Sequence, residues 1–130
     1  MITISKKVEY SIILIGFLAR KKGETVSLGE VSKKLRLPYR FLGQLASALR
    51  SANIIISKEG KSGGYSLAAD WQKKSLYELL EALGENKHMV KCLDENSLCA
   101  RVGNCEIKGI WGKIENVFMK ELKNIKLSEI

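Results

Sequence analysis

The chain has 130 residues, a size at which one compact domain is expected and a large multidomain enzyme is excluded. A hydrophobic content of 45% is enough for a core, and the longest nearly apolar run, residues 10–19, is too short to cross a membrane. The net charge is +8, and all the excess positive charge lies in residues 1–75, which carry 14 basic and 5 acidic side chains. Residues 76–130 carry 8 basic and 9 acidic side chains. A basic lobe is typical of a protein that binds a polyanion, although a lysine-rich surface that only promotes solubility has the same composition.

Nothing near the N-terminus predicts export. Lys6 and Lys7 precede an apolar stretch, but the basic Arg20, Lys21 and Lys22 follow it with no small-residue cleavage site. We therefore expect a cytoplasmic protein without a membrane partner, in which the cysteines are reduced, metal-bound or reactive.

Two helices are predicted before the only proline. Residues 5–22 are apolar nearly all round and are followed by Gly23, which predicts a deeply buried helix. Residues 28–35 read as an amphipathic helix capped by Ser27, with Glu30 three residues later completing a capping box.

A third helix is predicted from Pro38, which is tolerated in a first turn, to about Ser51. Its outward residues include Tyr39, Arg40 and Gln44. The short turn at residues 36–37 makes the second and third helices a helix-turn-helix whose second helix suits a major groove.

A β-hairpin is predicted next, with a β-branched strand at residues 54–56, a glycine-rich tip at 60–64 and a returning strand at 65–67. A helix-turn-helix followed by a basic hairpin is a winged helix, in which the wing reaches the backbone or the minor groove. We expect double-stranded DNA to be contacted by residues of the second helix, the third helix and the wing: Ser27, Lys33, Lys34, Tyr39, Arg40, Gln44, Lys58, Lys61 and Ser62.

Two more helices are predicted, a short one at residues 75–83 with a capping box of Ser75 and Glu78, and a long one at about 107–127. The long helix has a wide apolar stripe, which predicts a symmetric homodimer suited to a palindromic operator, the alternative being packing within one chain. The stripe consists of Ile107, Ile110, Trp111, Ile114, Val117, Phe118 and Leu122.

Three cysteines, Cys92, Cys99 and Cys105, lie between these two helices with the spacing C-x6-C-x5-C. Thiolates suit iron-sulfur clusters and zinc, and the gaps are wider than in most structural zinc sites. An iron-sulfur cluster, a zinc site and unligated thiols therefore all stay open. A metal site needs a fourth ligand, and the candidates are His88, Asp94, Glu106 and Glu9.

These elements predict a mainly α fold with a small β-hairpin. We expect a winged helix-turn-helix DNA-binding domain at residues 1–83, a cysteine-bearing loop at 84–106, and a dimerisation helix with a C-terminal tail at 107–130.

The order of elements resembles the Rrf2 family of bacterial transcription regulators, whose branches include IscR, NsrR and CymR. The resemblance covers Ile2 to Ile130 and rests on VSLGEVSKKLRLPYRFLGQLASALRSANII, the wing sequence GKSGGYSLA, the cysteine trio and the tryptophan-bearing last helix. It implies a homodimeric DNA-binding regulator that senses redox state, nitric oxide or iron-sulfur status. The implied cofactor is an iron-sulfur cluster held by the three cysteines, with 2Fe-2S favoured and 4Fe-4S the alternative.

The resemblance also bears on the fourth ligand. The IscR branch has a histidine three residues after the last cysteine, where this chain has Lys108. In the redox-sensing and nitric-oxide-sensing branches an acid from the first helix of the other subunit completes the site, and Glu9 occupies that place here. A carboxylate near a helix N-terminus is also favourable without any metal, and the alternative to Glu9 is a non-protein ligand or His88.

Two other functions stay open. A cluster-free repressor of the CymR kind, which controls cysteine and sulfur metabolism, would keep the DNA-binding half and need no cluster. A zinc-binding or thiol-redox protein is the third reading, but the chain has no C-x-x-C motif and no clear general base. No enzyme activity and no catalytic residue are therefore expected.

Overall fold

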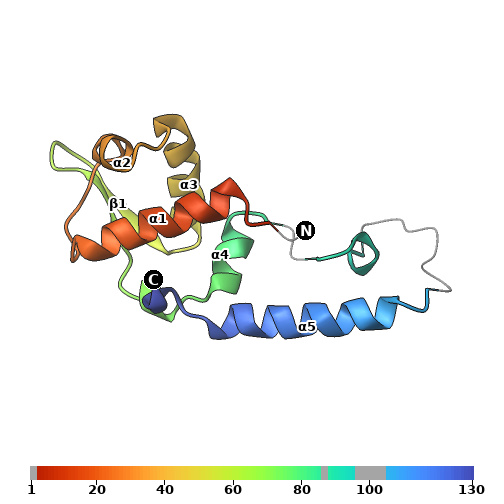
Figure 1. Ribbon diagram of the computed structural model, residues 1–130. Coiled ribbons are helices and arrows are strands. Elements are labelled where there is room, and N and C mark those ends of the chain that lie inside the picture. The colour runs from red at the N-terminus through yellow and green to blue at the C-terminus, as the bar shows by residue number, and fades with distance from the viewer. Residues whose placement is uncertain (1–2, 86–87, 96–104) are drawn as a thin grey trace.

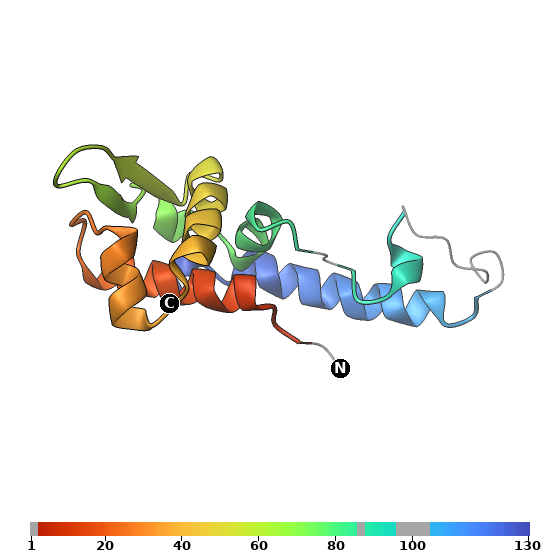
Figure 2. The same ribbon diagram turned by 90° about the horizontal axis from the view of Figure 1, so that it is seen from above.

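The computed structural model describes residues 3–85, 88–95 and 105–130. Helices α1 to α4 pack together with a hairpin, and helix α5 begins well outside this unit and reaches it only near its C-terminal end (Figures 1 and 2). The elements are α1 (Lys6–Arg20), α2 (Leu28–Leu35), α3 (Tyr39–Ser51), β1 (Ile55–Lys58), β2 (Gly64–Leu67), α4 (Leu76–Ala82) and α5 (Lys108–Asn124), with short 3-10 turns η1 (Trp71–Lys73), η2 (Lys91–Leu93) and η3 (Leu127–Glu129).

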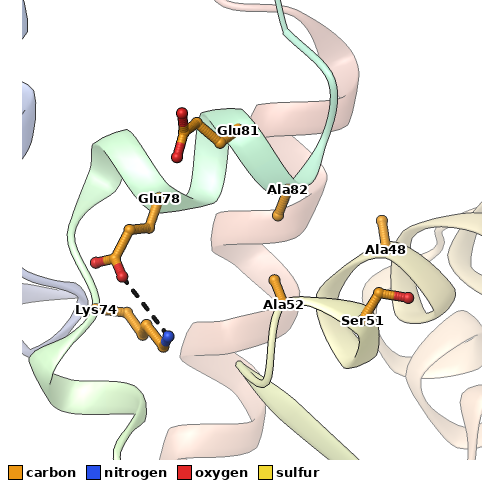
Figure 3. Close-up of a pocket in the computed structure, with 7 residues that line it drawn as sticks. All are labelled: Ala48, Ser51, Ala52, Lys74, Glu78, Glu81 and Ala82. Carbon is orange, nitrogen blue, oxygen red and sulfur yellow. Dashed lines mark ion pairs between the residues drawn. The ribbon is translucent and has the colours of Figure 1, made fainter.

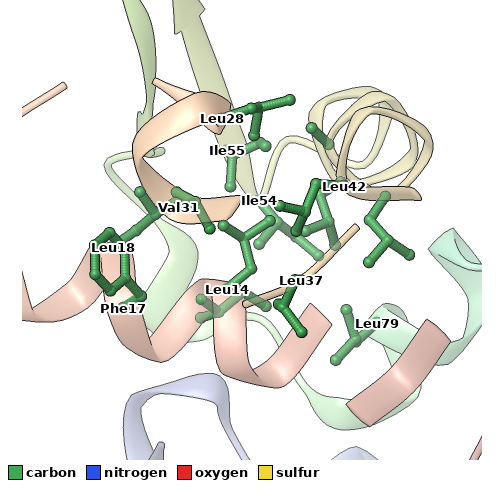
Figure 4. Packing of buried hydrophobic residues seen from close by; sticks show 14 of the residues in the cluster. Leu14, Phe17, Leu18, Leu28, Val31, Leu37, Leu42, Ile54, Ile55 and Leu79 are labelled. Atoms are coloured by element: carbon green, nitrogen blue, oxygen red, sulfur yellow. The ribbon is translucent and has the colours of Figure 1, made fainter. Parts of the chain in front are cut away.

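The mainly helical fold with one small hairpin confirms the predicted fold class. Helix α1 lies at the centre of it, and residues 14–18 are all buried, which confirms the burial expected from its apolar sequence. Leucine and isoleucine side chains of α1, α3, β1 and α4 meet in the core (Figure 4). None of the helices in the described residues is long and apolar enough to cross a bilayer.

The hairpin is tied to the loop before α2. Strands β1 and β2 pair antiparallel with Ile55 opposite Leu67, and Val26 exchanges two backbone hydrogen bonds with Tyr65, at 2.9 and 2.8 Å. Gly64 permits this approach, because a Cβ atom there would lie 2.3 Å from the Val26 carbonyl oxygen, and its φ of +152° disfavours other residues. The wing and the start of α2 therefore form one structural unit.

The residues after α5 return to the core. The Leu76 N–H donates to the Ile125 carbonyl at 3.0 Å, the Leu127 N–H donates to the Lys74 carbonyl at 2.8 Å, and the Leu127 side chain is fully buried. The last helix thus ends at Asn124 and not at the predicted residue 127, because the chain pairs with the segment before α4.

We predict that Gly64→Ala destabilises the protein by at least about 2 kcal/mol, because the added methyl group breaks the two Val26–Tyr65 hydrogen bonds and strains the backbone. Urea unfolding followed by circular dichroism measures the change.

Gly60→Ala is the matched control. Gly60 also has a positive φ, +106°, but a Cβ atom there meets nothing within 4 Å, so only the backbone strain of about 1 kcal/mol applies. Equal losses in the two variants would contradict the role given to the Val26–Tyr65 contact.

Candidate functional site

The helix-turn-helix is closed by a tight turn. Arg36 ends α2 in the left-handed conformation, with φ 54° and ψ 42°. The Ser32 side chain then donates to the Leu37 carbonyl at 2.7 Å, and Leu37 is buried. Pro38 is the N-cap of α3, where its missing N–H leaves no donor unpaired.

Helix α3 presents one face to the core and one to solvent. Leu42, Leu45, Ala46 and Leu49 are buried, whereas Tyr39, Arg40, Ser47 and Arg50 are exposed. Arg50 was not among the expected DNA contacts, although its helical spacing of three residues from Ser47 and eleven from Tyr39 indicates the shared exposed face.

Gln44 lies at the edge of this outward face. It is exposed, but it borders a cavity of about 170 Å³ together with Lys7 and Leu83, so it lies on the side of α3 that faces α1 and α4. Arg40 is therefore better placed than Gln44 to meet a ligand in front of α3.

The charges of α2 are partly neutralised within the protein. The Glu30 carboxylate lies 3.4 Å from the ammonium groups of Lys21 and of Lys34. These contacts lower the pKa of Glu30, and the hydrogen bond from Lys21 has the largest effect. The predicted capping box is only half formed, because the Ser27 hydroxyl accepts from the Glu30 N–H at 3.2 Å while the carboxylate bonds to the lysines. Lys33 is exposed on the same helix.

The wing is exposed and basic. Lys58 ends β1, Lys61 and Ser62 lie in the turn between the strands, and all three side chains are exposed. The hairpin, α2 and α3 lie on the same side of α1 (Figure 1). The structure thus places the basic residues of α2, of the wing and of the exposed face of α3 on one side of α1, around one helix of the size that enters a major groove.

An open groove of about 520 Å³ lies on the other side of α3, between its second half and α4 (Figure 3). Ala48, Ala52 and Ala82 line it, and its Lys74 ammonium lies 3.6 Å from the Glu78 carboxylate. Glu78 also completes the predicted capping box of α4, because its carboxylate accepts a hydrogen bond of 2.8 Å from the Ser75 N–H. This hydrogen bond is the main reason why the pKa of Glu78 is lowered. Glu78 is therefore already engaged in structural contacts.

Two of the three cysteines lie next to α5. Cys92 is in η2, which packs against α5, and the Cys105 carbonyl accepts from the Lys108 N–H, at 3.4 Å, where α5 begins. Both are free, half-buried thiols. Cys99 lies outside the described residues, and the described residues contain no group of three or more potential metal ligands.

Two of the candidate fourth ligands, His88 and Glu9, already have protein contacts. His88 Nδ1 lies 2.9 Å from Glu115 Oε1 on α5, and the exposed Glu9 carboxylate lies 2.8 Å from the Lys6 ammonium. Asp94 and Glu106 lie in the same part of the chain as Cys92 and Cys105.

The predicted apolar stripe of α5 divides into two faces. Trp111 and Leu122 are half-buried, on the same side of the helix as the buried Glu115. The rest of the stripe is exposed to solvent, from 37% for Phe118 to 66% for Val117: Ile107, Ile110, Ile114, Val117 and Phe118. An exposed apolar surface of this length marks an interaction site.

Comparison with known proteins gives consistent results. The family model described as "Rrf2: Iron-dependent Transcriptional regulator" matches residues 4–130. Protein rrf2 of Nitratidesulfovibrio vulgaris is 28% identical over 107 residues, which cover 82% of this chain and 71% of that protein.

Two solved structures have a similar fold. The structure of CymR, the global cysteine regulator of B. subtilis, has a TM-score of 0.74 at 26% identity and covers 98% of this chain and 94% of its own. The structure of T. potens IscR has a TM-score of 0.72 at 26% identity and covers 98% of this chain and 84% of its own.

Proposed function

Because the chain belongs to the Rrf2 family of DNA-binding transcriptional regulators, which are not enzymes, we propose that it acts as a homodimer whose DNA binding is controlled by an iron-sulfur cluster. A regulator acts where the DNA is, so we place it in the cytoplasm. The observation that carries the proposal is that two of the three cysteines lie beside the helix that bears the exposed apolar surface: Cys92 is in η2, which packs against α5, and Cys105 comes three residues before α5 begins.

In this proposal α3 enters the major groove. Arg40 and Tyr39 reach base edges or phosphates, and Ser47 and Arg50 lie on the same exposed face of α3. Gln44 lies at the edge of this face and contacts the DNA only from there. The wing residues Lys58, Lys61 and Ser62 meet the adjacent backbone or minor groove. In α2, Lys33 contributes phosphate affinity more than Lys34, whose charge faces Glu30, and Ser27 lies at the N-terminus of the helix.

The homodimer forms through the exposed part of the stripe, Ile107, Ile110, Ile114, Val117 and Phe118. The first half of α5 extends away from helices α1 to α4, and the described residues leave this face exposed to solvent (Figures 1 and 2). A second copy buries it, and the resulting two-fold symmetry matches a palindromic operator.

The donor set fits an iron-sulfur cluster. Cys92 and Cys105 are half-buried thiols next to α5, and thiolates are the ligands that such clusters prefer. The matching family model is described as iron-dependent. Such a cluster, when bound, supplies sensitivity to oxidants, nitric oxide or iron supply. We propose that Cys92, Cys99 and Cys105 hold it, with the partner subunit's Glu9 as the fourth ligand.

The chain itself provides the route from this site to DNA. Cys92 and Cys105 are attached to the N-terminal part of α5, and residues 125–127 join the other end of α5 to α4 and the core. A displacement of the cysteine segment therefore tilts α5 and changes the spacing of the two recognition helices.

A second function is favoured by a specific observation. The chain is as similar to B. subtilis CymR, with a TM-score of 0.74, as to T. potens IscR, with 0.72, at the same 26% identity. The second candidate is therefore a cluster-free repressor of the CymR kind, in which the cysteines bind no metal.

For the cluster, we predict that protein purified under strictly anaerobic conditions contains iron and acid-labile sulfide and absorbs visible light. Glu9→Ala is expected to change the spectrum or accelerate cluster loss, because it removes the oxygen ligand, whereas Lys6→Ala, which removes only the partner of Glu9, leaves the spectrum unchanged.

A colourless, iron-free sample would support the CymR-like function and overturn the cluster. A coloured sample whose Glu9→Ala spectrum matches that of the unaltered protein would retain the cluster and remove Glu9 from its ligands.

For DNA, we predict that Arg40→Ala weakens binding at least about fivefold, because a base-contacting arginine contributes about 1–3 kcal/mol. Fluorescence anisotropy measures the affinity for a palindromic duplex that the unaltered protein selects from a random DNA pool. Lys120→Ala removes the same charge from an exposed position on α5 and should change the affinity less than about twofold. Equal affinities of the Arg40 variant and the unaltered protein would exclude α3 as the recognition helix.

For the dimer, we predict that Val117→Glu gives a folded monomer, because Val117 is 66% exposed in one chain and the new charge is buried in the dimer. Sedimentation equilibrium measures the mass and circular dichroism the fold. Asn116→Glu is the control, since Asn116 is exposed on a different side of α5. A Val117→Glu variant that stays dimeric would place the dimer contact elsewhere.

A further inference from the structure

Helix α5 carries one buried charged side chain among the described residues, Glu115, which is 9% exposed. Its neighbours Lys113 and Asn116 are exposed. A buried carboxylate is unfavourable unless hydrogen bonds replace the lost water, so the contacts of Glu115 identify its role.

Both carboxylate oxygens are engaged by the same short segment. Glu115 Oε1 lies 2.9 Å from His88 Nδ1, and Glu115 Oε2 accepts a hydrogen bond of 2.9 Å from the Met89 backbone N–H. The bond from Met89 fixes the main chain itself, three residues before Cys92. Hydrogen bonds to a charged group are among the stronger ones in proteins.

The segment then runs along α5 towards the N-terminal end of the helix, where η2 packs against it (Figures 1 and 2). Met89 is bonded to Glu115, which lies seven residues into α5, and Cys92 follows three residues later in η2, which packs against the same helix. Residues 89–92 therefore connect Glu115 directly to Cys92 alongside α5.

We propose that Glu115 is a positioning residue that holds Cys92 on α5 in a fixed relation to Cys105. Cys105 is attached to α5 by the chain itself, with its carbonyl bonded to the Lys108 N–H, and Glu115 supplies the equivalent attachment for Cys92. The importance of this positioning for a metal site rests on the proposed cluster, because two of the three cysteine ligands are then held in place before any metal binds. The attachment uses protein groups alone and is therefore present in the metal-free protein.

The test uses the full-length, metal-free, reduced protein. The rate of iodoacetamide alkylation is measured separately at Cys92 and Cys105 by peptide mass spectrometry. Glu115→Ala is expected to raise the rate at Cys92 about tenfold, because losing both hydrogen bonds releases the segment, and to change the rate at Cys105 less than about twofold. Glu115→Gln, which keeps an acceptor for the Met89 N–H, should give an intermediate rate, and it is the decisive variant if Glu115→Ala unfolds.

Glu121→Ala is the matched control, because it removes an exposed carboxylate from the same helix, and its rates should equal those of the unaltered protein. Unchanged Cys92 alkylation in the Glu115 variants, or equal acceleration at both cysteines in a folded variant, would overturn the positioning role.

The second readout is the rate at which anaerobically purified protein loses iron to a chelator, expected to rise about tenfold in Glu115→Ala. If the unaltered protein binds no iron but Cys92 alkylation still responds, the positioning role stands and the cluster fails. If iron is bound but neither alkylation nor iron loss responds, the cluster stands and the positioning role fails.

Discussion

The backbone joint between residues 125–127 and 74–76 determines how the two halves of the chain act together. Two hydrogen bonds and the fully buried side chain of Leu127 connect the end of α5 to the segment before α4. The N-terminal part of α5 extends away from the other helices, so the joint fixes its direction (Figure 1). The core that supports α3 therefore also orients α5.

A second joint, the pair of backbone hydrogen bonds between Val26 and Tyr65, connects the wing to the helix-turn-helix on the side that we propose binds DNA. It ties the wing to the start of α2, so that the basic side chains of the hairpin and of the helix-turn-helix keep a common orientation. The separation of charge follows from this arrangement. The basic first part of the chain carries the surface that we propose binds DNA, and the nearly neutral remainder includes the cysteine segment and α5. Like charges therefore do not accumulate along the proposed dimer contact.

The order of the elements was predictable from the sequence, because hydrophobic periodicity, Pro38 and the capping box of Ser75 and Glu78 are local signals. Contacts distant in sequence were not predictable. Glu115 has the spacing of any polar residue on an amphipathic helix, and its burial depends on a segment 26 and 27 residues earlier. Trp111 and Leu122 likewise belong to the apolar stripe by periodicity, and only the packing of α4 and η2 against α5 separates them from its exposed part.

The fold is shared by relatives named IscR and CymR, so the fold alone does not select between a cluster-bound and a cluster-free regulator. In this chain the contacts of Glu115 do not depend on a bound metal. They hold the segment before Cys92 on α5 with protein groups only, and the Lys108 N–H holds Cys105 in the same way. Cluster binding then depends on whether a fourth ligand joins the cysteines. Lys108 has a cationic side chain that is a poor ligand, so the proposed cluster takes its fourth ligand from elsewhere, and the partner subunit's Glu9 is the ligand that we propose.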